Sequence, residues 1–324
     1  MKRRAFITLL GGAAAWPFAA RAQQTMPVIG FLRNTLQEDS VYLVTALRQG
    51  LKEAGYVEGQ NIAIAYRWAE NQSDRIPALA ADLVRSQCAV IITGGNAPTF
   101  AVKTATSSVP IVFVTGEDPV NTGLVASINR PTGNATGVTF YGGALVAKQL
   151  EVLREVVPKA TEIGMLVNPT SPAAQEQSRN AQVAASVLGL KIHILNASNE
   201  RDIEAAFATF AQRRVEALIF GGDALFTGQR ERLVTLAARH AMPAVYNLRE
   251  FVAAGGLISY GASSSQAYRQ AGIYAGRILK GEKPSDLPVI LPSKFELVIN
   301  LKTAKSLGLE LPWFLQQRAD EVIE

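Results

Sequence analysis

The sequence predicts an α/β protein with two doubly wound lobes in series. Short runs rich in Val and Ile alternate with longer amphipathic segments, and the alternation restarts once, after Gly137. Strict alternation of strands and helices predicts a parallel sheet covered by helices on both faces. The chain of 324 residues is also longer than a single compact core usually holds. The two halves of the pattern therefore predict two lobes.

The first half starts with an apolar run and then alternates. The expected strands lie at 28–32, 62–66, 89–93 and 110–115, and the expected helices at 41–54, 76–86 and 98–106. Apolar runs without polar alternation are typical of strands covered on both faces.

The second half repeats this order. The expected helices lie at 145–156, 172–188, 202–213 and 227–240, and the expected strands at 163–167, 191–195, 217–220 and 244–246. The order and spacing resemble those of the first half, although few residues are identical.

The end of the chain adds a strand at 255–261, a helix at 264–279 that Gly281 is placed to cap, and a strand at 295–300. One surplus helix followed by one surplus strand indicates a chain that crosses between the lobes three times. Three crossings make a hinge. The expected lobes are residues 27–139 plus 262–286, and residues 140–261 plus 287–324.

The first 22 residues have the three parts of a removable export signal. Lys2, Arg3 and Arg4 are basic, residues 6–20 are apolar, and Ala20-Arg21-Ala22 has small residues where a signal peptidase cuts. Paired arginines followed by Phe and Ile favour the twin-arginine route. The sequence therefore predicts a periplasmic protein. No later segment is long and uncharged enough to span a membrane.

Removal of this signal changes the charge balance. The whole chain has a net charge of +5, and the first 22 residues hold four basic side chains and no acidic one, which leaves 5 − 4 = +1. A nucleic-acid-binding domain needs a basic surface in its folded part. We therefore expect no nucleic-acid partner.

Other residue types limit the chemistry further. Cys88 is the single cysteine, and His193 and His240 are the two histidines, so we expect no internal disulfide, no metal site, and a buried Cys88. No nucleotide-binding glycine loop, nucleophile elbow or trusted carboxylate pair occurs. This pattern argues against an enzyme and indicates no cofactor.

Ligands of open parallel α/β sheets bind outside the carboxyl ends of the strands. In the first lobe this rule selects Thr93, Gly94, Gly95, Asn96, Ala97 and Thr115. The glycines allow close approach of backbone, Asn96 is expected to cap the next helix, and free amides at the helix start suit a carboxylate. The loop could equally be a plain turn with its own cap.

In the second lobe the same rule selects Asn168, Thr170, Ser171, Asp223, Tyr246 and Asn247. Asp223 could pair with an ammonium group or cap the helix that follows it. The rings of Phe31, Tyr141, Phe226 and Tyr246 could form an aromatic wall. Aromatic residues near strand ends more often pack inside a lobe, so we expect one or two of them to face a ligand.

Three segments carry a family resemblance. They are TGEDPVNTGLVASINRPTGNATGVT (115–139), AAGGLISYG (253–261) and LPSKFELVINLKTAKSLGLELP (291–312), and the final RADEVIE (318–324) fits as well. Together they resemble the TrpX-type substrate-binding proteins of ABC importers, over essentially the whole mature chain.

The resemblance implies a type I periplasmic-binding-protein fold with two Rossmann-like lobes and three hinge strands. It implies capture of a small ligand, an aromatic or other amino acid or a related aromatic acid, and delivery to an ABC permease in the inner membrane. The strand-end residues named above would be its contacts, in a monomer without a cofactor. An extracytoplasmic ligand-sensing module for a membrane receptor remains the alternative, since one fold serves both roles.

Overall fold

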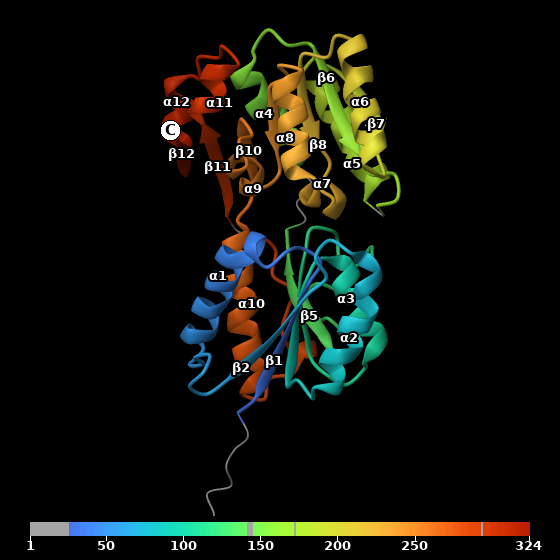
Figure 1. The fold of residues 1–324 in the computed structure, drawn as a ribbon, viewed down its shortest axis with the longest axis vertical. Helices are drawn as coiled ribbons and strands as arrows, with labels where there is room; N and C mark the ends of the chain where they lie inside the picture. Colours follow the sequence, from blue (N-terminus) through green and yellow to red (C-terminus); the bar gives the residue numbers. More distant parts are fainter. Residues whose placement is uncertain (1–25, 141–144, 172, 293) are drawn as a thin grey trace, which may run out of the picture.

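The computed structural model describes residues 26–140 and 145–324, apart from residues 172 and 293. The predicted export signal and Tyr141 lie outside these residues. Two lobes, each built around one sheet, follow one another along the longest axis of the molecule (Figure 1). The predicted fold class is confirmed.

The N-terminal lobe has a parallel five-stranded sheet in the order β2-β1-β3-β4-β5. Its strands are β1 (Val28–Arg33), β2 (Ala63–Trp68), β3 (Val90–Gly94), β4 (Ile111–Thr115) and β5 (Ala135–Thr139). After β1 the chain adds β2 on one side of β1, and it then adds β3 on the opposite side of β1. The strand order therefore reverses between β1 and β3, and ligands bind beside such a point in open α/β sheets.

Helices cover both faces of this sheet (Figure 1). They are α1 (Val41–Glu53), α2 (Ile76–Arg85), α3 (Asn96–Ala105) and α10 (Ser264–Leu279), with short 3-10 turns at Glu38–Ser40, Ser73–Arg75 and Pro284–Asp286. Ile29 and Phe31 pack with α1 and α10, whereas Leu32 packs with α2. This alternation of side chains along β1 divides the lobe into two cores.

The C-terminal lobe has a seven-stranded sheet in the order β12-β11-β10-β9-β8-β6-β7. Its strands are β6 (Glu162–Val167), β7 (Lys191–Asn196), β8 (Ala217–Phe220), β9 (Ala244–Tyr246), β10 (Ile258–Ala262), β11 (Phe295–Asn300) and β12 (Glu321–Ile323). The expectation of wholly parallel sheets is wrong at one place, because β10 and β11 are antiparallel. The chain leaves this lobe after β10 and returns along β11, so the two strands run in opposite directions.

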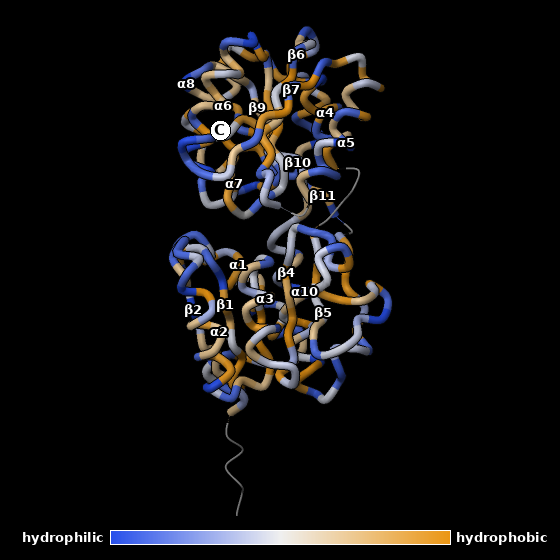
Figure 2. Tube along the Cα trace, turned by 90° about the vertical axis from the view of Figure 1, so that its right-hand side faces the viewer, coloured by the Kyte–Doolittle hydropathy of each residue, from blue (hydrophilic) through white to orange (hydrophobic). Residues whose placement is uncertain are grey.

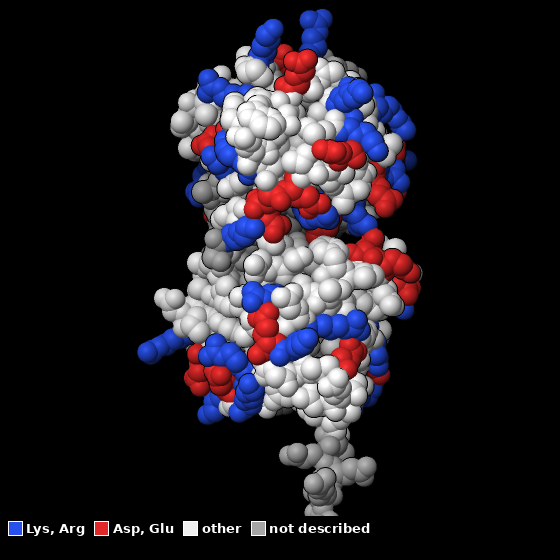
Figure 3. All heavy atoms as spheres, turned by 90° about the vertical axis from the view of Figure 1, so that its left-hand side faces the viewer, with Lys and Arg blue, Asp and Glu red and all other residues white. Residues whose placement is uncertain are grey.

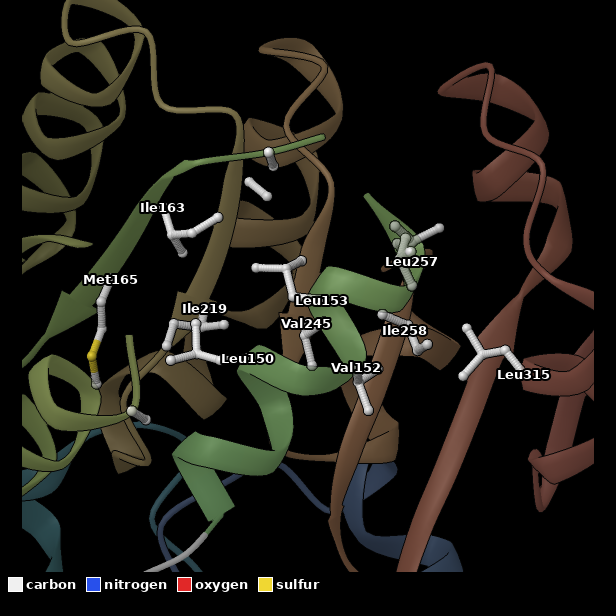
Figure 4. Close-up of a cluster of buried hydrophobic side chains, with 14 of the residues drawn as sticks. Leu150, Val152, Leu153, Ile163, Met165, Ile219, Val245, Leu257, Ile258 and Leu315 are labelled. Carbon is white, nitrogen blue, oxygen red and sulfur yellow. The ribbon is translucent and has the colours of Figure 1, made fainter. Parts of the chain in front are cut away.

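Eight helices among the described residues of the C-terminal lobe pack around this sheet, and two of them, α7 and α8, replace a single expected helix. They are α4 (Leu145–Val156), α5 (Ala174–Val187), α6 (Glu200–Gln212), α7 (Ala224–Gly228), α8 (Arg230–Arg239), α9 (Arg249–Ala253), α11 (Leu301–Ser306) and α12 (Trp313–Arg318). The helix expected at 227–240 divides at Gln229, which separates α7 from α8. One of the lobe's cores packs Leu150 and Leu153 of α4 against Met165, Ile219 and Val245 of the sheet (Figure 4).

The third crossing between the lobes lies later than residue 286, where the sequence placed it. Leu287 and Val289 are buried in the cores of the N-terminal lobe. Ile290 pairs with Val138, and its N–H donates to the Gly137 carbonyl at 2.9 Å. The segment at Ile290 therefore pairs with β5 at the edge of the first sheet, and the chain crosses to β11 only after it.

Two smaller predictions are confirmed. Cys88 is 4% exposed and packs in a core of the N-terminal lobe. Gly281 follows the end of α10 with φ of 102°, and its N–H donates to the Ile278 carbonyl. In the tube view, apolar segments run along the strands and polar ones lie toward the outside of both lobes (Figure 2).

Helices α1 and α10 approach closely through two glycines. A Cβ atom at Gly272 would lie 2.3 Å from the Leu47 carbonyl oxygen, and one at Gly50 would lie 1.9 Å from the Arg269 carbonyl oxygen. An ion pair between Arg269 and Glu53 spans the same contact at 2.6 Å. Segments more than 200 residues apart in the sequence are thus joined into one lobe.

We expect the substitution Gly272→Ala to lower the free energy of unfolding by about 1–3 kcal/mol, because the added methyl group forces the two helices apart. Urea denaturation followed by circular dichroism measures the change. Gly116→Ala is the control, since nothing lies within 4 Å of a Cβ atom at Gly116. Equal stability of Gly272→Ala and the unsubstituted protein would contradict the importance of this contact.

Candidate ligand-binding site between the lobes

The two lobes contact each other through side chains that follow the carboxyl ends of their strands. The Tyr42 hydroxyl at the start of α1 donates to the Glu250 carboxylate on α9. Arg230 of α8 forms an ion pair with Asp39, which precedes α1. These contacts hold the strand ends of the two sheets face to face. The polar residues that follow the strand ends include Asn96 and Glu117 on the N-terminal lobe and Asn168 and Asp223 on the C-terminal lobe. We call this group of residues the interlobe site.

On the N-terminal lobe, Asn96 joins two strand ends. Its side-chain oxygen accepts a hydrogen bond from Thr115 at the end of β4. Its side chain also hydrogen-bonds the carboxyl group of Glu117, two residues beyond Thr115. Asn96 was expected to cap α3, but Gly95 occupies the N-cap position with φ of 98° and no side-chain cap. Asn96 instead orients a carboxylate.

Two other predicted residues on this lobe are occupied internally. Thr93 is fully buried, and its hydroxyl hydrogen-bonds the hydroxyl of Thr99 at 2.8 Å. A Cβ atom at Gly94 would lie 2.2 Å from the Tyr268 hydroxyl. The absence of a side chain at Gly94 therefore lets α10 pack against this strand end.

The start of α3 keeps the anion-binding character that the sequence predicts. Asn96 and Ala97 are its first residues, Ala97 is exposed, and Pro98 follows. The first amides of a helix have no carbonyl one turn earlier to pair with, and they lie at the positive end of the helix dipole. These amides can donate hydrogen bonds to a carboxylate group.

On the C-terminal lobe, Asn168 and Asp223 form a matching arrangement. Asn168, after β6, donates from Nδ2 to Asp223 Oδ1 at 2.9 Å, and its own oxygen accepts from the Thr170 hydroxyl at 2.8 Å. Asp223 Oδ1 also accepts from the Leu225 amide at 2.8 Å and caps α7. The capping reading of Asp223 is confirmed, and this role leaves its other oxygen, Oδ2, outside the cap.

The remaining predicted residues of this lobe lie at neighbouring strand ends. Ser171 continues the turn after β6, where its N–H donates to the Asn168 carbonyl. Asn247 follows β9, and its Nδ2 lies 3.4 Å from the position of a Cβ atom at Gly222. Gln177 of α5 donates to the Gly222 carbonyl at 3.0 Å. Sequence reasoning missed Gln177, because it lies inside a helix rather than after a strand.

Sequence reasoning also missed Glu117 as a site residue. Burial raises the pKa of the Glu117 carboxyl above its usual range, and the negative charge of Asp223 on the other lobe raises it further. The signal was present in the sequence, since Glu117 follows the end of β4. The polar neighbour Asp118 instead closes its own turn by accepting from the Val120 amide at 2.8 Å.

The sequence matches the model of one family over residues 33–323, and that model describes an ABC transporter substrate binding protein. The match covers most of the chain. The chain belongs to the ABC transporter substrate binding protein family. This assignment agrees with a fold of two hinged α/β lobes.

One curated relative and two solved structures are similar to this chain over most of its length. A tyrosine-binding protein of Clostridioides difficile (strain R20291) is 25% identical over 262 residues, which are 81% of this chain and 75% of the relative. A conserved domain protein of Vibrio cholerae has a TM-score of 0.83 and 24% identity, covering 92% of this chain and 99% of its own. A domain in complex with L-Trp from Streptococcus pneumonia has a TM-score of 0.83 and 22% identity over the same shares.

The aromatic wall that the sequence suggested for this substrate-binding protein is wrong for the three described rings. Tyr246 is 1% exposed and stacks between Phe220 and Phe251 at centroid distances of 5.1 and 4.8 Å. Phe31 and Phe226 are buried in lobe cores. Because all three rings are buried in the cores of the lobes, they do not line the interlobe site.

The described residues contain no group of three or more His, Cys, Asp or Glu that could hold a metal ion, and no helix there is long and apolar enough to cross a membrane. His193 pairs with Glu162 away from the interlobe site. On the face in Figure 3, basic and acidic side chains are interspersed over both lobes.

We expect the substitution Tyr42→Phe to favour an open arrangement of the lobes in solution. It removes the hydrogen bond that reaches Glu250 from the other lobe, and a buried carboxyl group that loses a partner costs about 1–3 kcal/mol. Small-angle X-ray scattering of the ligand-free protein measures the change as a larger radius of gyration. Tyr56→Phe, just beyond the opposite end of α1, is the control. An unchanged scattering profile for Tyr42→Phe would contradict a role in closure.

Proposed function

We propose that this protein is the periplasmic solute-binding component of an ABC importer and that it captures a small carboxylate-bearing ligand, most simply an amino acid, between its lobes. The family assignment supports the transport role. The names of the relatives, one a tyrosine-binding protein and one a complex with L-Trp, support an amino acid as the ligand. The interlobe site supports the same class by its chemistry.

The observation that carries the proposal is that Asp223 of one lobe lies close enough to Glu117 of the other to raise its pKa, while Asn96, which hydrogen-bonds Glu117, is the first residue of α3. The ligand carboxylate lies against the free amides of Asn96 and Ala97 at the start of α3. The ligand ammonium group lies near Asp223 on the other lobe. Binding at both ends needs both lobes, and it therefore favours the closed arrangement.

In this proposal, closure of the two lobes over the ligand allows the protein to deliver that ligand to a permease. Export through the predicted twin-arginine signal places the protein in the periplasm. An inner-membrane permease then distinguishes the closed, liganded form from the open one, because closure changes the relative position of the two lobes. The protein acts as a monomer that binds and releases its ligand without turnover.

Ligand identity is tested directly by native mass spectrometry of the protein purified from the periplasm, followed by release of the bound molecule. We expect an amino acid to co-purify. Isothermal titration against the twenty amino acids and a set of aromatic acids then ranks the candidates. A protein that binds none of these solutes contradicts the proposal.

We expect the substitution Asp223→Asn to weaken binding of an amino acid by about 1.5–3 kcal/mol, the value of a hydrogen bond to a charged group. Asparagine is also a good helix cap, so the start of α7 remains intact. Isothermal titration measures the affinity, with the exposed Asp74 changed to Asn as the control. Wild-type affinity in Asp223→Asn would remove Asp223 from the site.

A further inference from the structure

Glu117 has a buried carboxyl oxygen that no described residue satisfies. Its Oε2 is shielded from solvent and has no hydrogen-bond partner among the described residues, although Asn96 hydrogen-bonds the carboxyl group. Buried polar atoms almost always have a partner, and leaving one unpaired is costly. An atom of this kind at the interlobe site indicates a ligand group that donates to it.

The same carboxyl group faces a second negative charge. Asp223, on the other lobe, is close enough for its charge to raise the pKa of Glu117. Two carboxylates in one site repel each other, and the repulsion is strongest when the lobes are closed. A cationic group between them removes the repulsion and satisfies Glu117 Oε2.

The two carboxylates are held in the same way on the two lobes. Asn96 holds Glu117 and is itself bonded by Thr115, whereas Asn168 holds Asp223 and is itself bonded by Thr170. Each carboxylate is thus oriented by an asparagine that a threonine orients in turn. Groups fixed before binding lose little entropy when the ligand arrives.

We infer that Glu117 and Asp223 together bind the cationic group of the ligand, so that the interlobe site selects carboxylates that carry an amine and rejects their deaminated analogues. This inference rests on the proposed function and narrows its ligand class to amino acids. Asn96 and Asn168 are positioning residues for the two carboxylates.

Selection follows from charge. A deaminated acid brings its own negative charge into a site with two carboxylates and supplies no cation between them, so the pair stays unsatisfied. Sites with buried polar groups discriminate strongly against analogues that leave those groups unpaired. The aromatic acids that the sequence left open as ligands are disfavoured on this ground.

Two pairs of compounds test the inference with the exported chain. L-tyrosine is compared with 3-(4-hydroxyphenyl)propionate, and L-tryptophan with 3-(indol-3-yl)propionate, by isothermal titration. The variant is Glu117→Gln, which keeps the length of the side chain and an oxygen for Asn96. The matched control is Glu310→Gln, an exposed glutamate of the C-terminal lobe.

We expect the amino acid of at least one pair to bind tenfold or more tightly than its deaminated analogue in the wild-type chain and in Glu310→Gln, as the loss of a charged hydrogen bond gives a factor of about ten or more. In Glu117→Gln, we expect the affinity for the amino acid to fall by a similar factor and the affinity for the analogue to stay the same or rise. The preference for the amino acid is therefore smaller in this variant. A wild-type chain that binds both compounds alike, or an unchanged preference in Glu117→Gln, overturns the inference and leaves the carrier role intact.

The pH dependence gives a second readout. Burial and the charge of Asp223 raise the pKa of Glu117, whereas a bound cation favours its ionised form. Amino-acid affinity therefore falls as the pH is lowered through the Glu117 pKa of the free protein, and Glu117→Gln reduces this fall. A wild-type affinity that stays constant as the pH is lowered from neutrality into the ordinary range of carboxyl pKa values overturns the inference. Binding of an aromatic acid without binding of any amino acid overturns the inference alone, whereas absence of binding by both classes overturns the proposed function as well.

Discussion

The common direction of the strands is the constraint on which the rest of the molecule depends. Apart from β11 and β12, the strands of each sheet are parallel, so the loops that follow them lie at the same edge of that sheet. Three crossings of the chain bring the two edges face to face, and the polar residues of both lobes meet there. Asn96 and Glu117 follow β3 and β4, whereas Asn168 and Asp223 follow β6 and β8. Four strand ends that are distant in the sequence thus form one site.

Within each lobe, aromatic and aliphatic side chains pack in the cores, whereas polar side chains make up the interlobe site. Phe220, Tyr246 and Phe251 stack in one core of the C-terminal lobe, and Phe31 fills a core of the N-terminal lobe. Burial of such rings contributes strongly to stability. The contact between Gly50 and Arg269 adds α10 to the first lobe although it follows the second lobe in the chain. The cores on the two sides of the interlobe site hold the elements that carry Asn96 and Asn168 in place.

The sequence predicted the elements well because their patterns are local. The helices expected at 145–156 and 264–279 have the observed bounds of α4 and α10. It missed β5 and β12, whose short strands have weak patterns, and the antiparallel pairing of β10 with β11, which depends on where the chain returns. At the site, the rule of strand ends selected Asn96, Asn168 and Asp223. It did not separate Thr93, which is buried against Thr99, from residues that face the other lobe.

The sequence by itself determined the class of fold, the number of lobes, the family resemblance and the strand-end loops that carry the polar residues. These features depend on periodicity and on the order of residues along the chain. Only the tertiary structure decided which side chains of these loops face the other lobe, that Tyr246 lies in a core, and that Glu117 opposes Asp223. The reason is that side-chain burial and charge opposition depend on how separate elements pack together in space, and for Glu117 and Asp223 the elements are more than 100 positions apart, which no local pattern records.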